Sequence, residues 1–173
     1  MRLDFIIVGL PRSGTTWASN LFTTDQSICW HDAMGWNLPE EMDIKPSSKQ
    51  YRGISCTAAW LWEDWFNWHP APKVILERDP KEVNESLIAL GMPPMEEDAI
   101  KLFKKLKGYR IPYTELFDNP QVIWDYLLPN LPFDAERHTE LVLMNIQPIE
   151  RVLVPDAEFV KRAIQDLQSR LIM

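Results

Sequence analysis

A glycine- and threonine-containing segment near the amino terminus has the residue types that bind an oxyanion. The segment Gly9–Trp17 reads GLPRSGTTW and follows the apolar run Phe5–Val8. Gly9 and Gly14 permit a tight turn that exposes backbone N–H groups, and Arg12 adds a positive charge suited to a bidentate grip on an oxyanion. A helix that follows this turn would direct its positive end at the anion. The segment therefore predicts a phosphate or sulfate site.

This segment differs at one position from the loop that binds ATP or GTP. Gly9 and Gly14 fit the pattern G-x-x-x-x-G-K-[ST], but Thr15 stands where a lysine would grip the β- and γ-phosphates. The missing lysine argues against a nucleoside triphosphate, and Arg12 can supply the charge instead. A plain turn from strand to helix, capped by Ser13 or Thr15, remains the alternative without a ligand.

The sequence PRSGTTW resembles the 5′-phosphosulfate loop of sulfotransferases that use 3′-phosphoadenosine 5′-phosphosulfate (PAPS). In that family the loop follows the pattern P-[KR]-[SA]-G-T-[ST]-[WL], so threonine in place of the lysine belongs to the pattern. The resemblance implies that the loop holds the cofactor and that Arg12 also has a catalytic role, neutralising charge on the leaving phosphate. The residues assigned to the cofactor in this way are Pro11, Arg12, Ser13, Gly14, Thr15, Thr16 and Trp17.

A second segment, KVILERDPKEVNES, is similar to the family's strand-and-helix element R-[ND]-P-x-[DE]-x-x-x-S. Arg78 ends an apolar strand, and Ser86 lies about two helical turns further along. The resemblance implies that Arg78 and Ser86 hold the 3′-phosphate, the group that distinguishes PAPS from ATP. Taken alone, Arg78 could instead form a surface ion pair with Asp79 or Glu82, and Ser86 could be an ordinary helix position.

A third segment, IPYTELFDNPQVIWDYLLPNLPFD, resembles the stretch that follows the core of many sulfotransferases. Its matching residues would be mainly structural, and they are Tyr113, Leu116, Asn119, Pro120, Leu131 and Phe133. The three segments occur in the order of the family. The cytosolic enzymes also carry a glycine- and lysine-rich loop that closes on the cofactor, and no such loop is evident in this sequence. Lys107, Arg110 and Arg137 are candidates to replace it.

The pair His31 and Asp32, in the segment CWHDAM, contains the candidate catalytic base. Both follow a short stretch that we expect to be the second strand, so they should lie where the loop opens. In the family, a histidine or an acidic residue takes the proton of the acceptor. We prefer His31 because an imidazole exchanges protons near neutral pH, and Asp32 remains the alternative. His69 and His138 are less suitable, because neither follows a strand expected to end in the cleft.

The segment AWLWEDWFNWHP is rich in tryptophan. The spacing of Trp62, Trp65 and Phe66 predicts one aromatic helix face, with Trp68 nearby. We prefer packing in the core as the interpretation. An aromatic wall for an apolar or sugar acceptor is the functional alternative. The run KLFKKLK predicts the solvated face of another helix.

Apolar segments of strand length alternate with helical patterns along the chain. The expected strands are Leu3–Val8, Ser27–Trp30, Lys73–Glu77 and Tyr109–Tyr113. The expected helices are Thr15–Thr23, Pro80–Ala89, Glu96–Lys107, Asn119–Leu128 and Pro155–Leu171. Residues 31–50 are rich in turn formers and predict a long functional loop. The alternation predicts one α/β domain over residues 1–173, a three-layer P-loop-type domain with a mainly parallel sheet flanked by helices.

Composition narrows the possible partners. The chain has 173 residues and a formal net charge of −7, which argues against binding to nucleic acid or to an anionic membrane. We expect no membrane span and no signal peptide, because the apolar runs are shorter than the roughly 20 residues that a span needs. Cys29 and Cys56 have no metal-ligand spacing, so we expect no metal site and a reduced, cytoplasmic location.

The resemblance predicts an enzyme, a PAPS-dependent sulfotransferase. It would move a sulfuryl group to a hydroxyl or amine of a small-molecule or glycan acceptor and release 3′-phosphoadenosine 5′-phosphate. Two alternatives stay open. A P-loop kinase for a small molecule or nucleotide would need a magnesium ligand, for which Asp79 is the only attractive candidate. A non-catalytic protein could retain the nucleotide loop without turnover.

Overall fold

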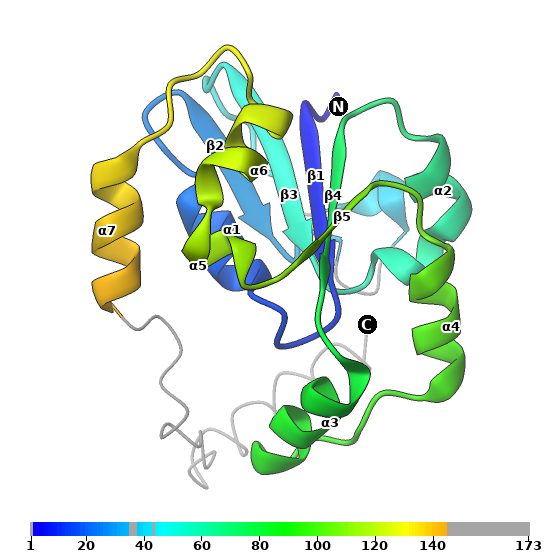
Figure 1. Ribbon diagram of the computed structural model, residues 1–173. Coiled ribbons are helices and arrows are strands. Elements are labelled where there is room, and N and C mark those ends of the chain that lie inside the picture. Colours follow the sequence, from blue (N-terminus) through cyan, green and yellow to red (C-terminus); the bar gives the residue numbers. More distant parts are fainter. Residues whose placement is uncertain (1, 35–37, 43, 145–173) are drawn as a thin grey trace, which may run out of the picture.

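A parallel β-sheet forms the centre of the molecule (Figure 1). The computed structural model of the 173-residue chain describes residues 2–34, 38–42 and 44–144. The five strands are all parallel and lie in the order β2-β3-β1-β4-β5. They are β1 Phe5–Gly9, β2 Ser27–His31, β3 Tyr51–Cys56, β4 Lys73–Glu77 and β5 Tyr109–Pro112.

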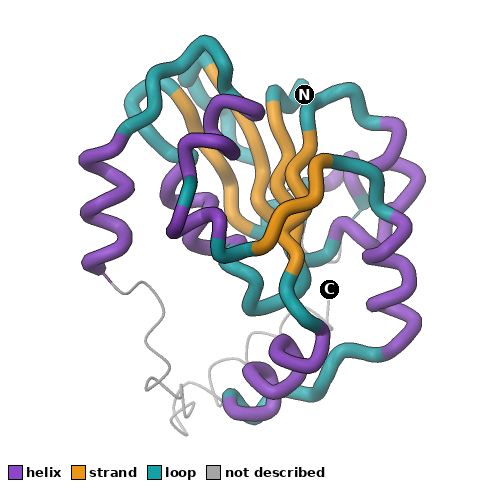
Figure 2. The backbone as a smooth tube through the Cα atoms, in the orientation of Figure 1, coloured by secondary structure: helices purple, strands orange, loops and turns teal. Residues whose placement is uncertain are grey.

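Helices cover both faces of this sheet and give the fold three layers (Figure 2). The α-helices are α1 Thr15–Leu21, α2 Glu63–Trp68, α3 Pro80–Ala89, α4 Glu97–Lys105, α5 Glu115–Asp118, α6 Pro120–Leu127 and α7 Ala135–Met144, and the 3-10 helices are η1 Pro39–Glu41 and η2 Ala59–Trp62. α1, α5, α6 and α7 pack on one face, and α2, α3 and α4 pack on the other. The predicted α/β architecture with three layers is confirmed.

β1 lies in the middle of the sheet, between β3 and β4, and is buried along its whole length. Phe5 and Ile7 point into the core beside α1 and α6, whereas Ile6 and Val8 point into the core beside α2 and α3. A strand buried on both faces needs a continuous apolar run rather than an alternating one. This burial fixes the segment that follows β1 at the centre of one sheet edge.

Most predicted elements are confirmed, with ends that differ by one or a few residues. The elements that were not predicted are β3, which lies between β2 and β1, the helices α5 and α7, and the short 3-10 helices η1 and η2. The long loop expected over residues 31–50 is confirmed in its described part, which holds only the end of β2 and the short η1. The helix predicted for Pro155–Leu171 lies outside the described residues.

The tryptophan-rich segment is divided between η2 and α2, so Trp62 precedes the helix that carries Trp65 and Phe66, although all three pack against one core. Phe66 is fully buried, and Trp60, Trp62 and Trp65 pack against the same core. Trp68 is 85% exposed. Packing in the core, the preferred interpretation, is therefore confirmed for every aromatic residue of this segment except Trp68.

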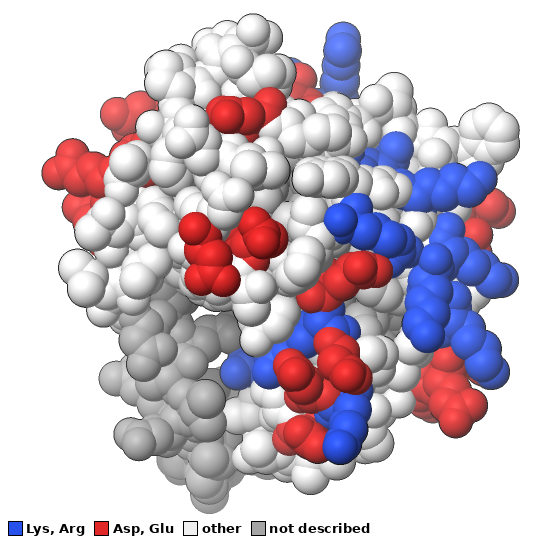
Figure 3. All heavy atoms as spheres, viewed as in Figure 1, with Lys and Arg blue, Asp and Glu red and all other residues white. Residues whose placement is uncertain are grey.

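Basic side chains gather over α4, where the blue atoms of Figure 3 concentrate on the right of the molecule. Lys101, Lys104, Lys105 and Lys107 are all exposed, whereas Phe103 is buried on the opposite side of the helix. The run KLFKKLK is thus a solvated face, as predicted. Within the described part of the chain, no helix combines the length and the apolar character needed to cross a membrane.

Candidate functional site

The carboxyl ends of the strands bring the candidate residues to one edge of the sheet. The Gly9–Thr16 loop leaves β1, Asp32 follows β2, Thr57 follows β3 and Arg78 follows β4. After β1 the chain enters α1 on one face, and after β3 it enters η2 and α2 on the other. The chain segments that follow the neighbouring strands β1 and β3 therefore go to opposite faces of the sheet. Open α/β sheets bind their ligands at such a point.

The Gly9–Thr16 loop makes a sharp turn into α1. Arg12 and Gly14 have φ angles of 66° and 81°, in the left-handed region. A Cβ atom on Gly14 would also lie 2.9 Å from a methyl group of Leu116, so both the backbone and the packing require glycine there. Ser13 is fully buried, and its hydroxyl has no hydrogen-bond partner within the described residues. A buried hydroxyl without a partner is uncommon in folded proteins.

Two arginines join the loop to the ends of β4 and α3. Arg12 Nε donates a hydrogen bond to Ser86 Oγ at 3.1 Å, and Arg78 Nη1 donates to the backbone oxygen of Arg12 at 2.5 Å. The Arg78 guanidinium stacks on the ring of Tyr113, 4.8 Å from its centroid. Its Nε also lies 3.3 Å from Glu82 Oε2, so the surface ion pair of the alternative interpretation is present as well. Two positive charges and a hydroxyl are thereby held beside the loop.

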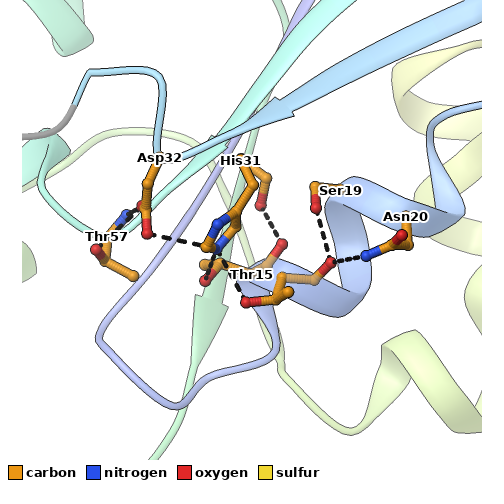
Figure 4. Close-up of polar contacts among 8 residues, drawn as sticks. Thr15, Ser19, Asn20, His31, Asp32 and Thr57 are labelled. Atoms are coloured by element: carbon orange, nitrogen blue, oxygen red, sulfur yellow. Dashed lines mark hydrogen bonds and ion pairs between the residues drawn. The ribbon is translucent and has the colours of Figure 1, made fainter. Parts of the chain in front are cut away.

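His31 ends β2 and points at the loop (Figure 4). Its Nε2 atom lies 3.0 Å from Thr16 Oγ1, 3.5 Å from Thr15 Oγ1 and 3.4 Å from Asp32 Oδ2. All three contacts use the same ring nitrogen, so His31 does not connect the carboxylate to a hydroxyl through its two nitrogens, as the histidine of a Ser-His-Asp triad does. The imidazole instead connects the loop directly to Asp32.

Asp32 is held in place by the end of β3. Its φ angle is 47°, in the left-handed region, which aspartate tolerates better than most residues. Its Oδ1 accepts hydrogen bonds from the backbone N–H of Thr57 at 2.8 Å and from the Thr57 hydroxyl at 3.1 Å. Its own N–H donates to the backbone oxygen of Ser55 at 2.8 Å. These bonds fix one carboxylate oxygen and direct the other toward His31.

An apolar cavity of about 590 Å³ is lined in part by Asp32, and the loop's threonines are not among its lining residues. Pro11 of the loop, Asp32 and Thr57 are among its lining residues. Trp60 and the segment Met92–Glu96 contribute to its other walls. His31 is not part of this lining, so Asp32 faces the cavity while His31 faces the loop. We call this space the apolar cavity.

Trp17 does not contribute its side chain to the site, contrary to its assignment to the cofactor. Its indole is 7% exposed and lies in the core, with ring centroids 4.8 Å from Phe117 and 5.5 Å from His138. The reason is its place on α1: Trp17 lies on the buried side of the helix. Only its backbone remains near the loop.

Two of the three candidates for a substitute closing loop have other roles in the described structure. Arg110 donates to the backbone oxygens that end α4 and lies 2.8 Å from Glu77 Oε1. Arg137 Nε donates to the backbone oxygen of Asn20 at 2.9 Å. Lys107 is exposed and follows α4. The contacts of Arg110 and Arg137 are structural, and neither arginine contacts the loop.

Asp79 and His69 also make other contacts. Asp79 caps the amino terminus of α3, where its Oδ1 accepts the N–H of Lys81 at 2.8 Å. His69 Nδ1 accepts the N–H of Ala71 at 3.2 Å, and burial, together with the nearby Lys73, lowers the pKa of His69. In the described ranges, no three histidine, cysteine, aspartate or glutamate residues are grouped so that they could hold a metal ion.

Sequence reasoning missed Thr57 and the walls of the apolar cavity. Thr57 lies directly after β3, so its position could have been found only by recognising that strand. Comparison with protein-family models, curated proteins and solved structures gives no match for this chain. Its function is therefore inferred from the residues and their geometry.

Proposed function

We propose that this protein is a sulfotransferase that moves a sulfuryl group from PAPS to a hydroxyl or amine acceptor. The observation that carries the proposal is the junction of Arg12, Ser86 and Arg78. These residues belong to two segments that lie far apart in the sequence. Each segment resembles a motif of the same family. Arg12 contacts Ser86, and Arg78 contacts the loop backbone, so one nucleotide with phosphates at both ends of its ribose could touch all of them.

The loop has the properties that a phosphosulfate group needs. Backbone N–H groups of the turn and the Arg12 guanidinium are the donors offered to an anion. In the reaction, the acceptor oxygen or nitrogen forms a bond to sulfur. The bond from sulfur to the bridging phosphate oxygen breaks, and its electron pair stays on that oxygen. Arg12 is the group that would stabilise the charge developing there.

The proton of the acceptor must go to a base, and His31 and Asp32 are the candidates. His31 is next to the loop threonines, whereas Asp32 faces the apolar cavity. His31 Nε2 lies 3.4 Å from Asp32 Oδ2, so a proton taken by either group is stabilised by the other. We assign His31 as the base and Asp32 as the residue that orients it.

Calorimetric titration tests the cofactor. We expect 3′-phosphoadenosine 5′-phosphate to bind more tightly than ATP, with no gain from magnesium, because Thr15 replaces the lysine that grips the β- and γ-phosphates and Arg78 is available to a 3′-phosphate. Adenosine 5′-phosphate, which lacks only the 3′-phosphate, is the matched control and should bind more weakly. Equal or tighter binding of magnesium-ATP would contradict the proposal and favour a kinase.

Turnover separates the enzyme from a binding protein. If the protein binds 3′-phosphoadenosine 5′-phosphate tightly but does not convert PAPS to it, with or without acceptors, it is a non-catalytic nucleotide-binding protein. The measurement is the conversion of PAPS to 3′-phosphoadenosine 5′-phosphate, monitored by chromatography. The kinase alternative has less support, because its magnesium candidate Asp79 is used as a helix cap.

A further inference from the structure

The apolar cavity adjoins the proposed cofactor site without overlapping its basic residues. Pro11 belongs to both the loop and the cavity wall, and Asp32 borders the cavity beside it. Arg12 and Arg78 are not in the lining. A molecule in the cavity could therefore reach the loop at Pro11 while the basic residues remain available to the nucleotide.

The lining of this cavity is mostly apolar, and both of its charged residues are acidic. Leu87 and Ala99 are buried in its walls, and Met92 is 50% exposed at the surface. The Asp32 side chain is 37% exposed, and Glu96 is an exposed residue of the wall. Among the described residues that line it, none is lysine or arginine. Such a lining favours an apolar ligand that carries a positive charge and disfavours an anion.

The outer wall is held by the helix that carries Ser86. The backbone N–H of Met95 donates to Asn84 Oδ1 of α3 at 2.8 Å, which ties the Met92–Glu96 segment to that helix. Ser86, two residues after Asn84, contacts Arg12. α3 thus supports the cavity wall and the proposed nucleotide site at once, so the cavity keeps a fixed position relative to the loop.

We propose that the apolar cavity binds a small apolar amine, and that this amine is the acceptor. Its volume of about 590 Å³ is that of an ordinary small-molecule site. The apolar body of the ligand would contact Leu87, Ala99 and Trp60, and its ammonium group would lie against Asp32. One ammonium proton would leave to solvent before the nitrogen lone pair forms its bond to sulfur, and His31 would take the second proton. A sugar would leave its hydroxyls without partners along these walls. The role as acceptor rests on the proposed function, whereas the binding preference does not.

Four probes of similar size test charge and polarity separately, by calorimetry or ligand-observed NMR. They are 2-phenylethylamine, 2-phenylethanol, 3-phenylpropionate and glucosamine. We expect 2-phenylethylamine to bind most tightly, the alcohol more weakly, and the carboxylate at least tenfold more weakly than the amine. Glucosamine carries the same charge as the amine without the apolar body, and we expect no measurable binding. Tighter binding of the carboxylate than of the amine, or equal binding of glucosamine, would overturn the proposal.

Two pairs of variants locate the binding. Ala99→Phe fills the cavity from α4 and should abolish amine binding, whereas Ala89→Phe, at an exposed position of α3 outside the lining, should not. Glu96→Lys should weaken the amine by roughly twofold to fivefold and strengthen the carboxylate, as expected for an exposed charge. Glu97→Lys makes the same change of charge one residue away, outside the lining, and should alter neither.

The results separate the two proposals. Unchanged amine binding in Ala99→Phe, with a thermal midpoint close to that of the parent protein, would place the amine elsewhere and refute the cavity proposal. If Ala99→Phe does not fold, the Glu96→Lys and Glu97→Lys pair decides, because both positions are exposed. Titration of 3′-phosphoadenosine 5′-phosphate on the same samples reports on the sulfotransferase independently. Its failure with normal amine binding would refute only the sulfotransferase.

Discussion

On the loop side of His31 the surrounding side chains are basic or hydroxylic, whereas on the cavity side of Asp32 they are apolar or acidic. The loop side has Arg12, Arg78 and Ser86, joined by hydrogen bonds. The cavity side is bordered by hydrocarbon walls and by Asp32 and Glu96. The two sides meet at adjacent residues of the chain, 31 and 32.

This contrast matches what a two-substrate transfer requires. An anionic donor needs hydrogen-bond donors and positive charge, and it would be repelled from the acidic cavity. An apolar acceptor gains nothing from the arginines, but it loses contact with water in the cavity. The opposite charge preferences of the two sides would direct the anionic donor to the loop and the apolar acceptor to the cavity. The residues between them, His31 and Asp32, are where the reacting groups would meet.

The strongest test of this division removes the residue at its boundary. His31→Ala should lower the rate of product release from PAPS by a factor on the order of 10²–10⁴, the usual contribution of a positioned base. The affinity for 3′-phosphoadenosine 5′-phosphate should change little, because the role proposed for His31 is toward the acceptor. Release of that product, measured by chromatography, gives the rate, and calorimetry gives the affinity.

His69→Ala is the control for this test, because His69 accepts the N–H of Ala71 and is outside the site. It should leave the rate unchanged. Asp32→Asn should have a smaller effect on the rate than His31→Ala if Asp32 only orients the ring. A larger effect for Asp32→Asn would identify Asp32 as the base and move the chemistry to the cavity side.

The next test addresses the basic side alone. Arg78→Ala should weaken binding of 3′-phosphoadenosine 5′-phosphate by about 2–3 kcal/mol, as expected for the loss of a charge-assisted bond. Adenosine 5′-phosphosulfate has no 3′-phosphate and should bind nearly as before. Calorimetry of both ligands makes the comparison.

Lys81→Ala is the control for Arg78→Ala and removes one positive charge from the first turn of α3. It should affect the binding of neither ligand, since Lys81 is exposed. Equal weakening of both ligands by Arg78→Ala would give Arg78 a different role. It would then act through its bond to the Arg12 backbone and shape the loop. The basic side would remain, but its 3′-phosphate subsite would be lost from the proposal.

The sequence predicts the loop side better than the cavity side, and the reason is physical. β1 and β4 are continuous apolar runs because both are buried on two faces, so their ends, with the loop and Arg78, can be located. β3 carries Arg52, Gly53 and Ser55 among its apolar residues and does not give this signal. Without β3, Thr57 has no predicted place, and neither has the contact that fixes Asp32.

The apolar cavity could not be predicted because its walls come from four separate parts of the chain. The loop, the residues after β2 and β3, and the segment between α3 and α4 meet only in three dimensions. α7 was missed for a related reason: it contributes only Leu141 to the buried core and has no strong apolar stripe. Local patterns report burial of one element, whereas a cavity depends on how several elements are placed.

A pair of glycine variants tests whether the loop side depends on its backbone. Gly14→Ala should lower the free energy of unfolding by about 1–2 kcal/mol for the left-handed backbone alone, with a further loss from overlap with Leu116. Gly91→Ala has a similar φ of 70° with no neighbour within 4 Å, so it measures the backbone effect by itself. Urea denaturation of both variants gives the difference. Equal losses in the free energy of unfolding would show that the Leu116 side chain moves aside without lowering the stability.

The smallest expected effect concerns the charge of Asp32 on the cavity side. Burial, and then the Asp32 carboxylate, raise the pKa of the Cys56 thiol from 9.0 to about 12. The folded protein then holds this proton where the unfolded chain releases it. The resulting stability is fully present below pH 9 and is lost as the pH rises toward 12.

Between pH 8 and pH 10, Cys56 should therefore lower the free energy of unfolding by roughly 1 kcal/mol. Cys56→Ala should reduce this dependence on pH, and Asp32→Asn should reduce it by less, because burial is the larger cause. Urea denaturation at the two pH values measures it. Cys29 is the control: burial and Cys56 raise its pKa, so Cys29→Ala should leave the effect of Asp32→Asn intact. If Asp32→Asn does not alter the pH dependence of the free energy of unfolding, the charge of the Asp32 carboxylate does not act on the Cys56 thiol.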